Sequence, residues 1–116
     1  MSEEYLRETF VYGTEFWDFY NSQTKQVQDK IDWVIDLVRS LKMVPEKFFK
    51  HLAGTDGLYE IRVKVGSNIF RIFCFFDKGK LVILLNGFQK KKQKTPKNEI
   101  VKAERLKKEY YESKRK

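Results

Sequence analysis

The sequence predicts an α+β domain in which a small antiparallel sheet carries helices mainly on one face. Three apolar runs between residues 58 and 88 are separated by short glycine-containing turns, which is typical of a strand meander. Two stretches before the meander and one after it repeat apolar residues at helical spacing. The expected order is strand, helix, helix, three strands and a final helix, in a single domain over residues 1–116.

The first part of the chain predicts one short strand and two helices. Residues 8–12 (ETFVY) are β-branched and aromatic and end at Gly13, so we expect a strand that joins the sheet at an edge. Thr14 is placed to cap a short aromatic helix, and Thr24 to cap a longer one. The longer helix carries one apolar stripe, which we interpret as core: Val27, Ile31, Val34, Ile35, Val38 and Leu41.

A proline separates these helices from the meander. Val44-Pro45 ends the second helix, because the residue before a proline is disfavoured in the α region. Pro45 then suits the first position of a short helical turn over the segment PEKFFKHL. Residues 58–65 alternate apolar and polar side chains, so one face of this first meander strand is expected to be buried.

The remaining elements complete the sheet and add a helix. Residues 69–76 are apolar on both faces at all but one position, which predicts a central strand covered on both sides. Residues 81–88 are nearly as apolar, and the short turns make the three strands antiparallel neighbours. Thr95 is a candidate cap for an amphipathic helix over residues 97–112, followed by a frayed tail over residues 113–116.

The distribution of charge points to a polyanionic partner. The formal net charge is +8. Residues 1–88 contain 12 Lys/Arg and 12 Asp/Glu, whereas residues 89–116 contain 12 and 4, so the second segment carries the whole excess. Nucleic acid is the first candidate partner, and a solvated helix face or tail is the alternative.

The composition argues against several classes of protein. Cys74 is the only cysteine and lies in an apolar run, so we expect a small buried hydrophobe. One His and one Cys supply too few ligands for a metal site, and no cofactor is expected. The acidic N-terminus does not resemble a secretory signal, and no segment approaches the roughly 20 apolar residues of a membrane span. We therefore expect a cytoplasmic protein that does not enter a membrane.

Arg71 is the most informative single residue, because a guanidinium in a covered strand keeps its charge. It must reach an edge, pair with an acid such as Glu60, or face a ligand. Arg62 and Lys64 lie on the polar side of the preceding strand, where simple solvation is the alternative. Whether they share a face with Arg71 depends on strand register, which the sequence does not fix.

Further cations flank the meander. Four lysines separate the last strand from the final helix: Lys90, Lys91, Lys92 and Lys94. Cations beside a helix N-terminus favour an anion such as phosphate. His51 follows Lys50 at the end of the short helical turn, and it is the default acid/base candidate because histidine titrates near neutrality. A structural or merely exposed histidine is the alternative.

Three segments resemble the RelE/HigB-like toxins of bacterial type II toxin–antitoxin modules, especially the phage-associated HigB branch. They are LAGTDGLYEIRV (52–63), NIFRIFCFF (68–76) and LLNGFQKKKQKTPKNEI (84–100). The resemblance implies a RelE-like fold and a ribosome-dependent endoribonuclease that cuts mRNA. In this family the 2′-hydroxyl attacks the adjacent phosphate without a metal ion, and a cognate helix-turn-helix antitoxin is the partner.

The same resemblance implies roles for individual residues. Arg62 and Arg71 would contact the scissile or a neighbouring phosphate. The basic segment after the last strand would stabilise the transition state or protonate the leaving group: Lys90, Lys91 and Lys92. Other cations would bind RNA or the ribosome: Lys50, Lys64, Lys94 and Lys97. Asn86 stands where many members of this branch have His, and Glu60 where more distant members are basic.

Two other functions stay open on the same fold. One is a non-catalytic, degenerate module that binds RNA, the ribosome or a protein partner, and it predicts salt-sensitive binding without cleavage. The other is a scaffold whose basic end docks an acidic partner.

Overall fold

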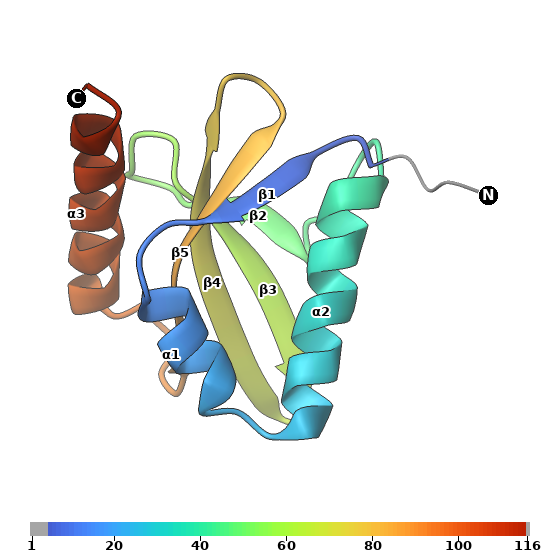
Figure 1. The fold of residues 1–116 in the computed structure, drawn as a ribbon. Helices are drawn as coiled ribbons and strands as arrows, with labels where there is room; N and C mark the ends of the chain where they lie inside the picture. Colours follow the sequence, from blue (N-terminus) through green and yellow to red (C-terminus); the bar gives the residue numbers. More distant parts are fainter. Residues whose placement is uncertain (1–4, 116) are drawn as a thin grey trace.

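The structure is a computed structural model that describes residues 5–115, in which a mixed sheet is packed between helices (Figure 1). The N-terminal half contains β1 (Glu8–Val11), α1 (Glu15–Asn21), α2 (Lys25–Ser40) and β2 (Phe49–His51). The C-terminal half contains β3 (Tyr59–Val65), β4 (Asn68–Asp77), β5 (Leu81–Lys90) and α3 (Lys97–Ser113). An α+β domain is thus confirmed. Of the predicted frayed tail, Lys116 lies outside the described residues.

The sheet has the strand order β1-β5-β4-β3-β2. The antiparallel meander β3-β4-β5 is confirmed, with β4 in the centre, and β1 lies at an edge as expected. The prediction of a wholly antiparallel sheet was wrong, because β1 runs parallel to β5 with Glu8 opposite Leu81.

The segment after Pro45 is a strand rather than the predicted short helix. Only one turn forms, in which the amides of Phe48 and Phe49 donate to the carbonyl of Pro45. The chain then extends as β2, antiparallel to β3, and Phe49 stacks on Tyr59 with ring centroids 5.0 Å apart. Aromatic residues fit a half-buried pleated surface, and this contact outweighs the helical start signal of the proline. His51 and the lysine before it consequently lie on an edge strand.

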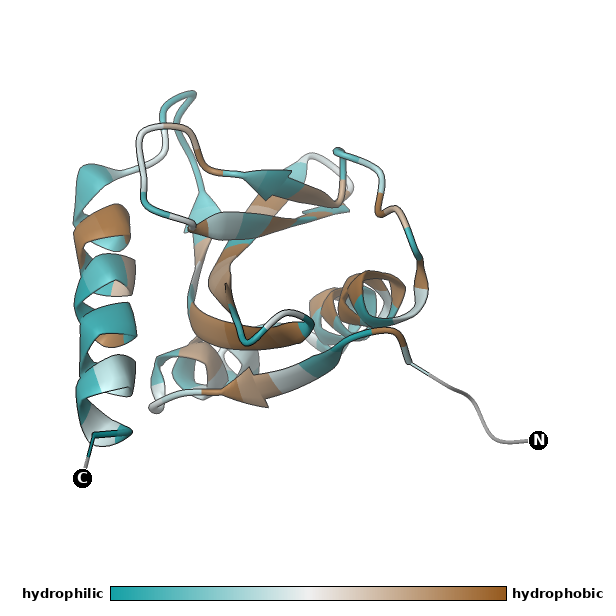
Figure 2. Cartoon of the chain, turned by 90° about the horizontal axis from the view of Figure 1, so that it is seen from above, coloured by the Kyte–Doolittle hydropathy of each residue, from teal (hydrophilic) through white to brown (hydrophobic). Residues whose placement is uncertain are grey.

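Helices cover both faces of the sheet, whereas the sequence predicted helices mainly on one. α1 and α2 pack on one face through the apolar stripe of α2, of which Val27, Ile31, Val34 and Val38 are buried. α3 packs on the other face through Ala103, Leu106 and Tyr110. β4 is therefore buried on both sides, as its sequence predicted. Figure 2 shows hydrophobic residues concentrated on the central strands, with α3 hydrophilic over most of its length.

The predicted helix caps are confirmed in part. The Thr24 side chain accepts a hydrogen bond from the Val27 amide at the start of α2. Thr14 occupies the cap position of α1 without a side-chain cap bond. The cap of α3 is Pro96 rather than Thr95, because Pro96 has an extended backbone and Lys97 is the first helical residue.

A buried carboxylate ties α3 to the end of β4. Asp77 accepts hydrogen bonds from the hydroxyl of Tyr110 (2.6 Å) and the ammonium of Lys114 (2.7 Å). The hydrogen bond from Lys114, followed by that from Tyr110, lowers the pKa of Asp77 below its ordinary value. The carboxylate therefore stabilises the fold above the pKa of an unfolded aspartate, near 3.8, and this stabilisation is lost as the pH falls through the lowered pKa.

We expect Asp77→Asn to lower the free energy of unfolding by about 1–3 kcal/mol at pH 7, since it removes the acceptor of charged and buried donors. Urea denaturation at pH 7 and at pH 3 measures the effect, and the difference from wild type should shrink at the lower pH. Asp29→Asn is the control, because the Asp29–Lys25 ion pair is exposed. A difference that stays constant over this pH range would contradict the assignment.

Candidate functional site

Strand register brings the two predicted arginines together. Arg62 of β3 lies directly opposite Arg71 of β4, so both side chains project from the same face of the sheet. The next row on that face pairs Lys64 with Ile69, which in turn lies opposite Lys90 at the end of β5. The question that the sequence left open is therefore answered, and the cations form neighbouring rows across three strands.

Glu60 lies between the two arginines. Its Oε1 atom is 3.2 Å from the Nε of Arg62 and 3.6 Å from the Nε of Arg71. Glu60 and Arg71 are buried, with Arg71 only 7% exposed, and Arg62 is half-buried. Burial lowers the pKa of Arg71, the Glu60 carboxylate opposes this effect and the Arg62 charge adds to it, yet a guanidinium stays protonated in proteins. The ion pair with Glu60 that the sequence offered as an alternative is thus present.

These contacts leave buried polar atoms without hydrogen bonds. Glu60 Oε2 and the Nε atoms of Arg62 and Arg71 have no hydrogen-bond partner among the described residues, although the Nε atoms are within ion-pair distance of Glu60. The Nη1 atoms donate weakly to carbonyls, from Arg71 to Phe70 (3.2 Å) and from Arg62 to Glu46 (3.4 Å). A cluster of incompletely satisfied buried groups is typical of a site that a ligand or water completes.

A cavity of about 300 Å³ opens beside the arginines. Its lining combines five basic side chains with three apolar ones, and these described residues include no carboxylate: Lys30, Lys47, Phe48, Arg62, Val63, Lys64, Ile69 and Arg71. We call this cavity the arginine pocket. Paired guanidinium groups, which can bind phosphate oxygens in bidentate fashion, surrounded by lysines make it suitable for a phosphate group.

Two of these lysines were missed by sequence reasoning. Lys30 comes from α2 and lies off the predicted apolar stripe of that helix. Lys47 comes from the turn before β2, inside the segment predicted as helical. No local signal distinguishes them from solvated lysines, because their position depends on how α2 and β2 pack beside β3.

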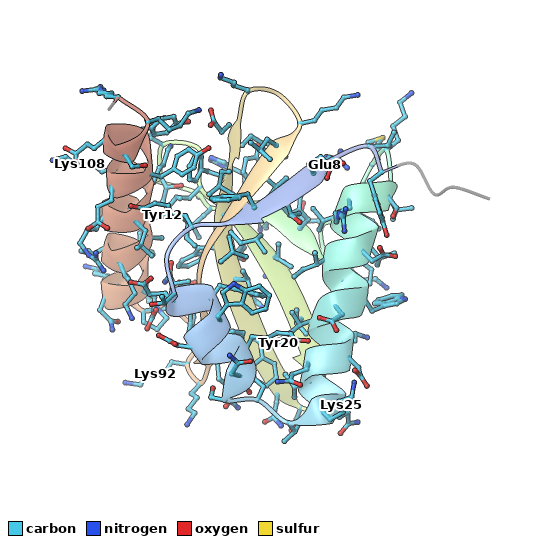
Figure 3. All side chains as sticks on the ribbon, viewed as in Figure 1. Glu8, Tyr12, Tyr20, Lys25, Lys92 and Lys108 are labelled. Atoms are coloured by element: carbon cyan, nitrogen blue, oxygen red, sulfur yellow. The ribbon has the colours of Figure 1, made fainter. Side chains whose placement is uncertain are left out.

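The four lysines that the sequence places between the last strand and the final helix do not gather in the arginine pocket. Lys90 is the last residue of β5, not the first residue after it, and is half-buried. Lys91, Lys92 and Lys94 are exposed on the loop before α3, and none of them lines the arginine pocket. Figure 3 shows Lys92 at the same end of the molecule as Lys25. Lys97 is also exposed, at the first position of α3.

His51 and Lys50 do not line the arginine pocket. His51 lies opposite Tyr59 with its ring 5.2 Å from the Tyr59 ring, and Tyr59 packs on the face covered by α1 and α2. Its alternation along β2 therefore places it on the opposite face from Arg62. Lys50 forms an ion pair with Glu46 at 3.4 Å. The only histidine is thus not positioned to transfer a proton at the arginines.

Two other residues of the resemblance are structural. Asn86 is buried and donates to the backbone and side-chain oxygens of Glu99, so it joins β5 to the start of α3. Cys74 is fully buried, as predicted, and burial raises the pKa of its thiol. A thiol held protonated in a core is a poor nucleophile and metal ligand.

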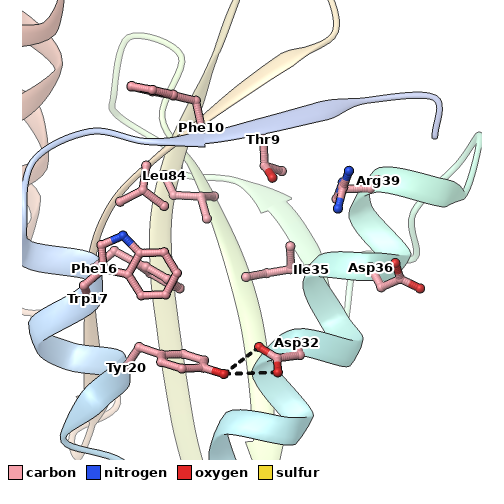
Figure 4. Close-up of a pocket in the computed structure, with 11 residues that line it drawn as sticks. Thr9, Phe10, Phe16, Trp17, Tyr20, Asp32, Ile35, Asp36, Arg39 and Leu84 are labelled. Atoms are coloured by element: carbon pink, nitrogen blue, oxygen red, sulfur yellow. Dashed lines mark hydrogen bonds between the residues drawn. The ribbon is translucent and has the colours of Figure 1, made fainter.

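A second cavity, of about 490 Å³, lies on the face covered by α1 and α2 (Figure 4). Aromatic residues and two carboxylates line it, including Trp17, Tyr20, Asp32 and Asp36. The hydroxyl of Tyr20 donates to Asp32 at 3.0 Å, and burial, followed by this hydrogen bond, raises the pKa of Tyr20. This cavity contains none of the predicted site residues, and its carboxylates make it unfavourable for phosphate.

Residues 5–115 contain no cluster of His, Cys, Asp and Glu side chains with the arrangement of a metal site. Within the same residues, no helix is long and apolar enough to cross a membrane.

Comparison with known proteins places the chain in a family. Residues 18–108 match the family model described as Phage derived protein Gp49-like (DUF891). The match extends from α1 to α3 and includes the arginine pocket and the lysines of the loop before α3. A search of curated proteins found no match. Because the model covers most of the sequence, the chain belongs to the Gp49-like family of phage-derived proteins.

Proposed function

We propose that this protein is the toxin of a type II toxin–antitoxin module and acts as a ribosome-dependent mRNA endoribonuclease. The observation that carries the proposal is the arginine pocket, where Arg62, Arg71 and Lys64 meet two further lysines without a lining carboxylate. The membership in a phage-derived family and the resemblance to RelE/HigB-like toxins support the same function.

In the proposed reaction the ribose 2′-oxygen attacks the neighbouring phosphorus atom. As the new bond to phosphorus forms, the 2′-hydroxyl gives up its proton and the bond to the 5′-oxygen breaks. The 5′-oxygen takes up a proton, so the products are a 2′,3′-cyclic phosphate and a 5′-hydroxyl, and no water or metal ion is consumed. Arg71 and Arg62 would stabilise the charge that builds on the phosphate oxygens in the transition state. Lys64 and Lys90, one row away on the same face, would bind an adjacent phosphate or protonate the leaving oxygen.

The arginine pocket contains few side chains that can act as an acid or a base, which fits a reaction that depends on how the RNA is positioned. Alignment of the attacking oxygen with the phosphorus can supply a large part of the rate, and the decoding site of the ribosome would impose that alignment. The exposed lysines of the loop before α3 would bind ribosomal RNA: Lys91, Lys92, Lys94 and Lys97. Such contacts make association strongly dependent on salt concentration.

The proposed partner is an antitoxin with a helix-turn-helix domain, encoded beside the toxin, and the proposed compartment is the cytoplasm. The positive charge concentrated after residue 88 would attract an acidic segment of that partner.

Primer extension on an mRNA tests the function. We expect the purified protein to cut the message when translating ribosomes are present and to leave it intact in their absence. Expression without the antitoxin should stop growth, and co-expression with the adjacent gene should restore it. Intact mRNA and normal growth at good expression would overturn the proposal.

A non-catalytic binding module is the second candidate. It is favoured because His51 lies on the opposite face of the sheet from Arg62, and because Glu60 forms ion pairs with both arginines. It predicts that the protein sediments with ribosomes at low salt and leaves the message uncut.

A further inference from the structure

An exposed tryptophan lies beside the arginine pocket. Trp33 projects from α2 and is 49% exposed, an unusual position for so large an apolar ring. The ammonium of Lys30 lies 4.8 Å from the centre of the indole ring. The Phe48 ring meets it edge to face, with ring centroids 5.5 Å apart. The indole is therefore held in place by two residues that also line the arginine pocket.

Trp33 also lines a cavity of about 430 Å³. Its lining includes Lys30 and Lys64, both shared with the arginine pocket, so the two hollows are adjacent beside α2 and β3. Asp29 also lines it, but the Asp29 carboxylate is engaged by Lys25 at 2.6 Å. An aromatic face thus adjoins a row of cations at the point where a nucleotide chain would leave the phosphate site.

From this juxtaposition we infer that Trp33 stacks on an unpaired nucleobase of the RNA whose phosphate occupies the arginine pocket. Single-stranded RNA is recognised through bases that stack on aromatic side chains while cations follow the backbone. Lys30 and Lys64 contact the phosphate on the side of the base, and the indole contacts the base itself. The inference rests on the proposed function for its RNA ligand, and it adds a base-binding subsite to the phosphate site.

The other tryptophan provides a matched comparison. Trp17 is 47% exposed, nearly the same as Trp33, but it lies in the cavity with Asp32 and Asp36 and packs edge to face on Phe16 at 4.9 Å. One cation, Arg39, also lines that cavity, but the two carboxylates leave its lining net negative, which repels a phosphate backbone. The two rings are therefore nearly equally exposed, and what distinguishes Trp33 as an RNA-binding ring is the positive charge of the side chains around it.

Binding of a fluorescein-labelled single-stranded octaribonucleotide, followed by fluorescence anisotropy, tests the subsite. The 2′-oxygens are methylated so that the RNA cannot be cleaved. We expect Trp33→Ala to raise Kd about tenfold, in line with the loss of one stacked base. Trp33→Phe should recover most of the affinity, and Trp17→Ala should bind within about twofold of wild type. Circular dichroism checks that each variant is folded.

A set of octamers with one abasic nucleotide distinguishes stacking from a structural effect. At the stacked position, removal of the base should raise the Kd of the wild type by the same factor of about ten. The Kd of Trp33→Ala should not change. The inference is overturned if Trp33→Ala binds the octamer as tightly as wild type, or if the wild type does not bind the RNA. It is also overturned if Trp33→Ala loses the same affinity, relative to wild type, on every abasic octamer. The primer-extension assay reads the proposed function separately, because cleavage on the ribosome with an unaffected Trp33→Ala variant would reject only the stacking subsite.

Discussion

Arg71→Ala should lower the rate of ribosome-dependent mRNA cleavage by a factor of about 10²–10³, the usual cost of removing one preorganised donor from a transition state. Arg71 is held by its position in the central strand and by the Glu60 carboxylate, so its orientation is fixed before RNA binds. A lysine cannot replace the planar guanidinium in bidentate contact with phosphate. Arg71→Lys should therefore remain impaired, although less than the alanine variant.

Single-turnover primer extension at saturating ribosome concentration measures the rate constant. Arg115→Ala is the matched control, since it removes the same charge from an exposed position after α3. Arg71→Ala should retain a cooperative unfolding transition, because Glu60 still pairs with Arg62 in that variant. Cleavage by Arg71→Ala within about threefold of the wild-type rate would show that the arginine pocket is not the site of reaction.

Glu60→Ala should lower the free energy of unfolding by about 3–5 kcal/mol, because it leaves two guanidinium groups without a buried counter-ion. The Glu60 side chain is 7% exposed and the Arg71 side chain 8%, so the lost carboxylate leaves a guanidinium charge where contact with solvent is small. This loss is a large fraction of the 5–15 kcal/mol that usually stabilises a domain. We expect poor expression at elevated temperature and a marked fall in the urea midpoint.

Glu46→Ala is the control for this variant, since the Glu46–Lys50 ion pair is mostly exposed and should contribute little. A double-mutant cycle isolates the ion pair itself. Glu60→Ala/Arg71→Ala should cost less than the sum of the two single changes, because removing Arg71 relieves part of the uncompensated charge. Additive losses would contradict coupling between the two side chains.

Much of the fold is predictable from local patterns. The apolar stripe from Val27 to Val38 predicts α2, and the double-sided apolar run of β4 predicts its central place in the sheet. Both patterns record which faces of one element are buried. They do not record which element covers each face, and for that reason the sequence missed α3 on the side of the sheet opposite α1 and α2.

β2 and the direction of β1 were missed for a related reason. The strand at Phe49 exists because β3 offers a free edge and Tyr59 offers a stacking partner. Neither condition is visible in the residues after Pro45, which carry an ordinary helix-start signal. The parallel pairing of β1 likewise depends on partners near residue 81, far along the chain.

The residues of the candidate site also include some that local patterns predict and some that they do not. Arg62 and Arg71 were identified because charged residues in apolar strands require an explanation, and register then placed them opposite each other. Lys30, Lys47 and Trp33 were not identified, because their own segments do not show which other elements they lie beside. Their arrangement around the pocket arises only when α2 and the turn before β2 pack beside β3.

The parallel pairing of β1 with β5 has a consequence for how the chain folds during synthesis. α1 and α2 leave the ribosome long before residues 81–84, the partners of β1, have been made. Until then the buried face of α1, including Phe16, lacks β5, the strand against which α1 packs, whereas α2 can already pack on β3. Contacts between residues so distant in sequence close slowly. β1 and α1 should therefore stay sensitive to protease and bind chaperones until β5 is complete, whereas every residue that lines the arginine pocket has already been made by residue 71.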